Sequence, residues 1–165
     1  MKKITSNKEK HYLAVTLSGE NDKEVLTQMA SALQEEGYVK DSFPEAILKR
    51  EEVYPTGLPV GEISVAIPHT DPEHVNDAAI CLGILDKPVT FNVMGMEGET
   101  TDVSILFMLS IKHKEDQMDM LQKLITVCQN QDTLKEIMAQ DMDKINEVMT
   151  TLVEGEELNK LPKGK

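Results

Sequence analysis

The sequence contains no tryptophan, and aromatic residues make up only 4% of its 165 residues. Aliphatic side chains and ten methionines must therefore fill the interior. Positive charge is also scarce, because 17 Lys and Arg stand against 29 Asp and Glu, a formal net charge of -12. Nucleic-acid binding depends on neutralising phosphates with Lys and Arg, and stacking platforms are few, so we expect no nucleic-acid partner.

Cysteines and long apolar runs are equally scarce. Cys81 and Cys128 are the only two cysteines, and they match no disulfide framework and no C-x-x-C motif. The basic N-terminus, residues 1–15, has no following apolar segment of a signal peptide. No stretch approaches the roughly 18 apolar residues of a membrane span. We therefore expect a cytoplasmic protein that does not itself insert into a membrane.

Several glycine-dependent motifs are missing as well. The sequence has no G-x-S-x-G, no G-x-x-x-x-G-K-[ST] and no G-x-G-x-x-G. The hydrolase, nucleotide-binding and dinucleotide-binding hypotheses thus lack their local geometry. The sequence gives no reason to expect a cofactor.

The residues that are present predict a single α/β domain over 1–155, followed by a loose polar tail over 156–165. Apolar runs without helical spacing predict strands, and those in the middle of the chain indicate a sheet covered on both faces. The predicted strands are 12–17, 63–67, 78–85 and 102–111, with a hairpin or irregular loop over 91–101. The predicted helices are 22–36, 41–52, 114–128, 132–139 and 141–153.

Capping residues mark the ends of these helices. The first helix has Asn21 or Asp22 as its N-cap and Gly37 as its C-cap, and the last-but-one has Asp132 as its cap. The second helix has Asp41 or Ser42 as its cap, with Pro44 in its first turn. On the helix over 114–128 we expect Met118, Leu121, Leu124 and Ile125 to form the buried stripe.

His69 is the leading candidate for chemistry. It follows the apolar run Val65 to Ile67 and then Pro68, which lacks an N–H and should end the strand ladder. The histidine side chain is then expected at the rim of the sheet, where α/β proteins place their ligands. A rim imidazole is a nucleophile within reach of another molecule, although a surface turn is the commoner role of a single histidine.

Two neighbouring residues strengthen the case for an anion at this rim. Thr70 offers a hydroxyl, and the backbone amides of the turn from Thr70 to Asp71 can form an anion nest. Arg50, at the end of the second helix, has a planar fork that suits a phosphoryl group. The alternatives are that Thr70 stabilises a turn and that Arg50 is an exposed helix terminus.

A metal site is the competing hypothesis for this stretch. His69, Asp71, Glu73 and His74 lie within six positions, but their spacing does not match a zinc site. We therefore expect no metal.

The stretch from 50 to 71, REEVYPTGLPVGEISVAIPHTD, resembles the enzyme IIA component of the bacterial phosphoenolpyruvate-dependent sugar phosphotransferase system. The resemblance is to the fructose and mannitol type, and most of all to its galactitol-like subgroup. It runs from about Asp22 to Met149 and includes YPTGL, VAIPHT and EDQMDMLQKL, in that order.

The resemblance implies a mixed β-sheet flanked by helices and a phosphotransferase with a phosphohistidine intermediate. The acceptor falls on His69 and the active-site arginine on Arg50. Many relatives carry a second histidine where this chain has Gln117, which can orient a phosphoryl group or a ring but cannot carry positive charge. His113 lies four residues upstream, in the connector, with no role that we can read.

The resemblance also implies the partners. The phosphocarrier protein HPr would supply the phosphoryl group, and a cysteine of enzyme IIB would accept it for uptake of a galactitol-like sugar through membrane enzyme IIC. One alternative is a regulatory protein of the same kind, whose phosphorylation state controls binding to a target. A second is an interaction module in which His69 is only structural. The sequence leaves open the sugar, the oligomeric state and the ring nitrogen that reacts.

Overall fold

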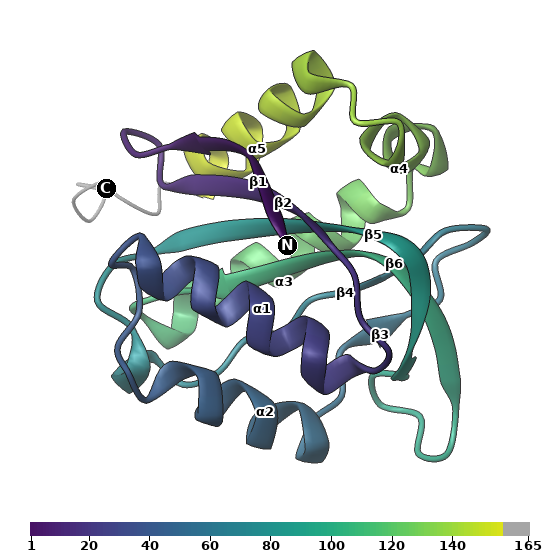
Figure 1. Cartoon of the computed structure of the whole chain (residues 1–165), viewed down its shortest axis with the longest axis horizontal. Helices are drawn as coiled ribbons and strands as arrows, with labels where there is room; N and C mark the ends of the chain where they lie inside the picture. The colour runs from purple at the N-terminus through teal and green to yellow at the C-terminus, as the bar shows by residue number, and fades with distance from the viewer. Residues whose placement is uncertain (157–165) are drawn as a thin grey trace.

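A six-stranded mixed sheet lies between two layers of helices in the computed structural model, which describes residues 1–156 (Figure 1). The strand order is β1-β2-β5-β6-β4-β3. The strands are β1 (Lys2–Asn7), β2 (Tyr12–Leu17), β3 (Gly57–Leu58), β4 (Ser64–Ala66), β5 (Ala79–Asn92) and β6 (Thr100–Ser110). The helices are α1 (Asp22–Glu35), α2 (Phe43–Val53), η1 (Pro72–His74), α3 (Lys114–Cys128), α4 (Gln131–Met138) and α5 (Met142–Glu156).

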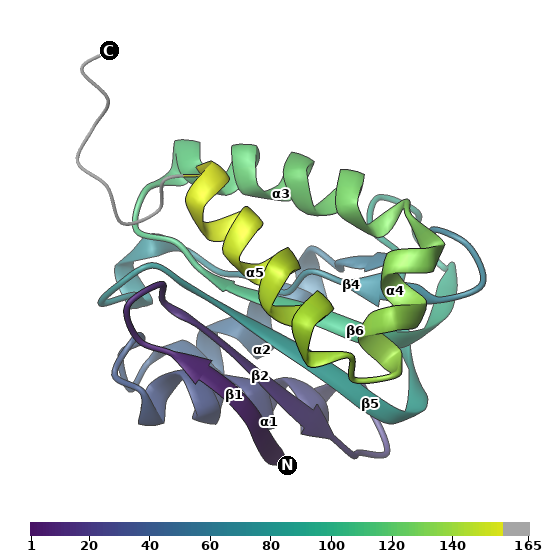
Figure 2. The same ribbon diagram turned by 90° about the horizontal axis from the view of Figure 1, so that it is seen from above.

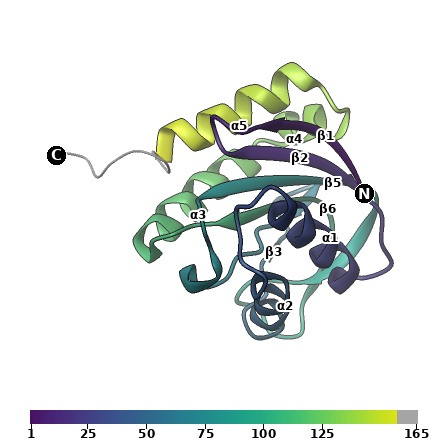
Figure 3. The ribbon, with the colours of Figure 1, turned by 60° about the vertical axis from the view of Figure 1, so that its left-hand side comes forward.

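The two helical layers cover opposite faces of the sheet. Helices α1 and α2 lie on one face, and α3, α4 and α5 lie on the other (Figures 2 and 3). The buried residues form two apolar clusters, one on each face; Met29, Phe43 and Phe91 belong to the first and Phe107, Met120 and Ile145 to the second. The prediction of a mixed sheet flanked by helices is confirmed.

The central strands β5 and β6 form a long antiparallel hairpin that carries parallel neighbours on both sides, β2 beside β5 and β4 beside β6. Their register shifts between Ile84 and Val89, at the exposed residues 86–88. The pairing resumes at Val89 and continues to Asn92. The prediction that this strand ends at 85 was therefore too short. Gly95 and Gly98 both have positive φ in the turn, which confirms a hairpin.

Helix α1 ends where its sequence indicates. Asn21 is the N-cap, and its side chain accepts a hydrogen bond from the N–H of Glu24. At the other end, Gly37 has φ +86, and the N–H groups of Gly37 and Tyr38 donate to the carbonyls of Gln34 and Leu33. This Schellman motif turns the chain toward α2.

Helix α2 has Pro44 in its first turn, as predicted, and Ser42 at the N-cap position. The Ser42 hydroxyl does not cap the helix; it bonds Nδ1 of His74 at 2.8 Å. The backbone N–H of Lys40 also donates to the His74 carbonyl, and Lys40 Nζ donates to the carbonyl of Glu73. These bonds fasten the segment that follows His69 to the connection between α1 and α2.

Several sequence predictions about elements were wrong. Residues 2–7 form the edge strand β1, which was not predicted. The segment contains no apolar run, because Ile4 is its only apolar residue. The N-cap of α4 is Asn130, whose side chain accepts from the N–H of Thr133, and not Asp132. Met118 is 60% exposed, since the buried face of α3 consists of Gln117, Met120, Leu124 and Cys128.

The predicted polar tail begins at residue 156, which is the last residue of α5. The rest of that tail, residues 157–165, lies outside the described residues. Among residues 1–156, no helix is both long and apolar enough to pass through a lipid bilayer.

Candidate functional site

His69 lies just beyond the end of β4, on the connection that leads to η1. Strand β4 ends at Ala66, but the carbonyl of Pro68 still accepts a hydrogen bond from the N–H of Leu109 on β6. Pro68 therefore ends the strand as predicted, while its oxygen keeps the segment attached to the sheet. The imidazole is half-buried at the rim.

The two ring nitrogens of His69 have different surroundings. Nδ1 lies 2.9 Å from the carbonyl oxygen of Ile67. Because a carbonyl can only accept, Nδ1 carries the hydrogen and the neutral ring keeps its lone pair on Nε2. Burial lowers the pKa of His69, and the nearby Arg50 guanidinium lowers it further, against the opposing effects of the Ile67 carbonyl and Asp71. Burial and Arg50 both favour the neutral ring, and the Ile67 carbonyl favours the tautomer with the hydrogen on Nδ1.

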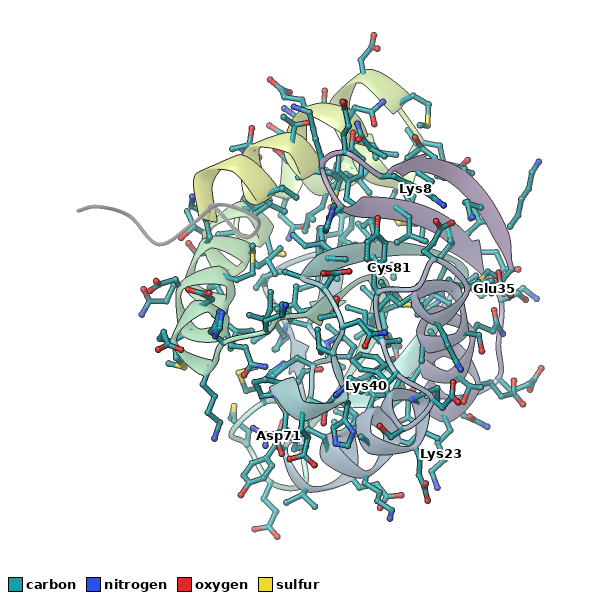
Figure 4. The ribbon with its side chains drawn as sticks, turned by 90° about the vertical axis from the view of Figure 1, so that its left-hand side faces the viewer. Lys8, Lys23, Glu35, Lys40, Asp71 and Cys81 are labelled. Carbon is teal, nitrogen blue, oxygen red and sulfur yellow. The ribbon has the colours of Figure 1, made fainter. Side chains whose placement is uncertain are left out.

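Arg50, in the last turn of α2, lies near His69. Its Nη1 is 3.7 Å from a carboxylate oxygen of Asp71, and its Cζ is 4.4 Å from the centroid of the Tyr54 ring. Its Nε is buried and has no hydrogen-bond partner among the described residues. In Figure 4, Asp71 lies on the connection after β4, beside α2. The guanidinium is held between an aromatic ring and a carboxylate with donor capacity to spare.

Thr70 and Gln117 meet next to His69. Gln117, in the first turns of α3, donates from Nε2 to the carbonyl oxygen of Thr70 at 2.8 Å, and both residues are buried. Helix α3 begins soon after β6, whose end lies beside the end of β4. The structure therefore brings together all four residues singled out from the sequence, and Gln117 holds the backbone next to His69.

The sequence did not single out three other participants. Tyr54 stacks on Arg50, Asp71 faces it, and the Ile67 carbonyl fixes the His69 ring. The side chain of Asp71 was considered only as a metal ligand and its backbone only as part of an anion nest, although its place two residues after His69 was a usable signal. Within residues 1–156 no group of three or more His, Cys, Asp or Glu side chains is arranged to hold a metal ion.

A groove with a volume of about 640 Å³ adjoins the site. It lies between residues 52–55, after Arg50, and residues 92–98 of the β5–β6 hairpin, and it touches the site through Tyr54. Val53, Tyr54 and Met96 are the exposed apolar side chains of this groove, at 67%, 59% and 56% exposure. The exposed apolar side chains therefore lie on the Tyr54 side of the site.

A half-buried imidazole beside a guanidinium with an unused donor is an arrangement suited to an anion, and the imidazole lone pair is a nucleophile of the kind used in group transfer. Comparison with known proteins agrees with this chemistry. Residues 7–151 match the family model described as "Phosphoenolpyruvate-dependent sugar phosphotransferase system, EIIA 2". The chain belongs to this family and is a phosphotransferase component of that system.

Individual relatives point the same way. The "PTS system galactitol-specific EIIA component" of Escherichia coli (strain K12) is 27% identical over 130 residues, which cover 79% of this chain and 86% of the relative. The crystal structure of IIA mannitol from Escherichia coli has a TM-score of 0.68 at 15% identity, covering 88% of this chain and 99% of that one. At this identity the structural likeness establishes the fold.

A further solved structure is a complex of enzyme IIAMTL and phosphorylated enzyme IIBMTL from Escherichia coli. It has a TM-score of 0.67 at 16% identity and covers 91% of this chain and 98% of that chain. The fold of this chain is therefore also found in a protein that binds a phosphorylated enzyme IIB.

Proposed function

We propose that Nε2 of His69 accepts a phosphoryl group and passes it on. The observation that carries the proposal is the hydrogen bond from Nδ1–H to the Ile67 carbonyl, which leaves the lone pair on Nε2. The lowered pKa, caused first by burial, supplies the unprotonated nucleophile at neutral pH. Phosphoryl transfer requires little beyond in-line positioning and charge balance, which a half-buried rim ring permits.

In this proposal, Arg50 balances the charge of the phosphoryl oxygens, and Thr70 and Gln117 orient the group. Arg50 has a free buried Nε donor among its described surroundings and a fork suited to two oxygens. Gln117 acts on the backbone of Thr70 rather than on the ring, because its amide nitrogen donates to that carbonyl. Thr70 and Gln117 therefore shape the segment that carries His69.

The proposed donor is the phosphocarrier protein HPr and the proposed acceptor is a cysteine of enzyme IIB. In the first step Nε2 attacks phosphorus, the donor's P–N bond breaks, and its electron pair returns to the donor ring. In the second step a thiolate attacks phosphorus and the bond to His69 breaks. The complex of IIAMTL with phosphorylated IIBMTL supports an enzyme IIB as the second partner.

The proposed setting follows from these partners. The substrate is a galactitol-like sugar that enters through membrane enzyme IIC, which this chain meets only indirectly. We place the chain in the cytoplasm, since Cys81 and Cys128 are both free and buried, as is usual in a reducing compartment. The acidic composition and the apolar groove beside Tyr54 suit a donor with a basic, partly apolar face.

The test is phosphorylation with phosphoenolpyruvate, the first enzyme of the system and HPr. We expect one acid-labile, alkali-stable phosphate on the wild-type chain and none on His69→Gln. His113→Gln, which changes an exposed histidine at the start of α3, is the matched control and should be labelled like the wild type. Label that persists in His69→Gln would refute the assignment.

Onward transfer distinguishes the alternatives. Transfer of the label from His69 to an enzyme IIB cysteine supports the transport function. Stable label without such transfer, together with binding to a target that depends on phosphorylation, indicates the regulatory alternative. A chain that takes up no phosphate at all is an interaction module, and the proposal is then wrong.

A further inference from the structure

Glu51 is an acidic residue inside the protein, immediately after Arg50. It is only 6% exposed, and none of the ion pairs found among the described residues includes it. Its carboxyl group accepts from the backbone N–H of Thr56 at 2.8 Å and from the Thr56 hydroxyl at 2.9 Å. Both hydrogen bonds go to one residue, five positions further along the chain.

Thr56 links this carboxyl group to the histidine. The carbonyl oxygen of Thr56 accepts a hydrogen bond from the N–H of Ile67 at 3.3 Å, where β3 begins its pairing with β4. The carbonyl oxygen of Ile67 in turn accepts from Nδ1 of His69. The hydrogen-bonded route from Glu51 to the reactive ring therefore passes through two residues only.

The same turn also places an aromatic ring beside the arginine. Tyr54 lies between Glu51 and Thr56, and its ring faces the Arg50 guanidinium at 4.4 Å. The N–H of Tyr54 donates to the carbonyl of Arg50, which ends the helix. If Thr56 were released, this turn would keep the hydrogen bond from Tyr54 to Arg50 but would lose the bonds between Glu51 and Thr56 that close it.

We propose that Glu51 is a positioning residue for phosphoryl transfer, a staple on Thr56 that fixes both Tyr54 beside Arg50 and the Ile67 carbonyl that selects the His69 tautomer. This inference deepens the proposed function and rests on it. Glu51 touches neither the ring nor the guanidinium in any contact that the structure gives, and it acts through Thr56.

The surroundings of Glu51 are costly for a carboxylate. Burial raises its pKa to about 7, the hydrogen bonds from Thr56 oppose that rise, and Asp22 at the start of α1 adds to it. A buried acid without a cation is more expensive than an apolar side chain of the same size. A carboxyl group suits this turn because its two oxygens can accept from the N–H and the hydroxyl of Thr56 at the same time. The protonated acid can hold Thr56 too, by donating to its hydroxyl oxygen while accepting from its N–H.

The experiment compares Glu51→Ala with Glu51→Gln. Glutamine can accept from the Thr56 N–H and donate to the Thr56 hydroxyl, so it keeps the staple without the charge. We expect transfer from phospho-HPr to be slowed at least about tenfold in Glu51→Ala and to be restored by Glu51→Gln to within about threefold of wild type. Glu45→Ala, which removes a 78% exposed side chain from the same helix, should match the wild type.

A second measurement reads the ring directly. The ¹⁵N chemical shifts of His69 report which ring nitrogen carries the hydrogen, whether or not the chain is phosphorylated. We expect Nδ1–H in the wild type and in Glu51→Gln, and a mixture of tautomers in Glu51→Ala. If Glu51→Ala does not fold, Thr56→Val, which lacks the hydroxyl but keeps its N–H, should show a smaller change in the same direction.

The outcomes separate the two proposals. If folded Glu51→Ala transfers phosphate at the wild-type rate with an unchanged His69 tautomer, Glu51 is merely structural and the inference is wrong. The inference is also wrong if neither variant at Glu51 folds and Thr56→Val leaves both measurements unchanged. If the wild type takes up no phosphate, the proposed function has failed, and the tautomer shifts still decide what Glu51 does.

Discussion

At the scale of single residues, the site depends on the unequal environments of the two His69 nitrogens. A carbonyl acceptor fixes the hydrogen on Nδ1, and burial together with Arg50 disfavours protonation of Nε2. A nucleophile and an anion-binding cation usually compete, since the cation depresses the basicity of the nucleophile. In the proposed function that depression is useful, because it keeps the ring unprotonated when the phosphoryl donor binds.

This arrangement predicts how His69 titrates. Its pKa lies below the ordinary value of 6.5, so the ring should gain its second proton only as the pH falls below that value. The rate of phosphoryl uptake should consequently begin to fall at a lower pH than it would for a histidine of ordinary pKa. An NMR titration of the ring in the wild type and in Arg50→Ala measures this. A titration midpoint above 6.5 in the wild type would contradict the prediction.

Arg50 gives a second prediction at this scale. Arg50→Ala should slow phosphoryl transfer by about 10- to 100-fold, because a donor to the phosphoryl oxygens is lost. Arg50→Lys should recover only part of the rate, since lysine lacks the planar fork. Folding should change little, as the side chain is partly exposed and its pairing with Asp71 is long.

The control for Arg50 is Lys49→Ala, which removes a neighbouring, 75% exposed cation from the same helix. It should transfer phosphate at the wild-type rate. Equal rates for Arg50→Ala and Lys49→Ala would mean that Arg50 is no more than a charged helix end.

The residues to which we assign chemistry stand out in the sequence more clearly than those that we propose position them. His69 and Arg50 stand in a recognisable order of short motifs, and Pro68 marks the end of a strand. Glu51 and Tyr54 belong to the same stretch of sequence, but their roles depend on how the chain turns back from α2 to β3. A hydrogen bond to a backbone carbonyl, such as the one from His69 to Ile67, does not depend on the side chain of the accepting residue, so the sequence does not reveal it.

At the scale of elements, the site is the meeting point of four segments. The end of α2 supplies Arg50, the end of β4 supplies His69, the start of α3 supplies Gln117, and the turn before β3 joins the first two. Because β4 and β6 run parallel, the exit of β4 and the entry to α3 lie together. A hydrogen bond from Gln117 to the Thr70 carbonyl connects them.

That connection predicts a cost when it is removed. Gln117→Ala leaves the buried Thr70 carbonyl without its donor, so it should lower the free energy of unfolding by about 1–3 kcal/mol. It should also slow phosphoryl transfer, because the segment next to His69 is less firmly held. Urea unfolding measures the first effect. Gln122→Ala, an exposed change on the same helix, should leave stability within about 0.5 kcal/mol of wild type.

If Gln117→Ala were as stable as Gln122→Ala, the junction between α3 and β4 would have to be held by other contacts.

Local sequence signals predicted most elements, and they failed where tertiary context decides. Helix α3 has the bounds that its pattern indicates, and Gly37 ends α1 through the motif that glycine favours. Strand β1 is polar and exists because the edge of β2 is available for pairing. The two-residue strand β3 lies in what reads as a turn, and only its pairing with β4 makes it a strand.

At the scale of the whole molecule, the sheet separates two apolar cores, and the site lies at the end of the sheet rather than inside either core. Segments around residues 50, 69 and 117 are far apart in sequence and are brought together by the strand order. A change that loosens one helical layer can therefore disturb the geometry of the site from a distance.

Glu51 gives a prediction for the stability of the whole molecule. Its pKa is raised from 4.5 in the unfolded chain to about 7 in the folded protein. Between these values the folded state binds more protons, so the contribution of Glu51 to stability falls as the pH rises through this window and is constant above it. Glu51→Gln removes this dependence.

Thermal unfolding at several pH values between about 4.5 and about 8 tests this expectation. The Tm of Glu51→Gln should gain on that of the wild type as the pH rises to about 7 and then keep a constant difference. A constant difference across the entire range would show that the Glu51 carboxyl group titrates alike in both states.

The central claim is that Nε2 of His69 carries the phosphoryl group while Nδ1 stays bound to the Ile67 carbonyl. The most direct measurement is NMR of the phosphorylated, ¹⁵N-labelled chain, in which the ring nitrogen bonded to phosphorus shows a one-bond coupling to ³¹P. We predict that coupling at Nε2 of His69 and a retained hydrogen on Nδ1. Coupling at Nδ1, or phosphorus on any other residue, would contradict the account.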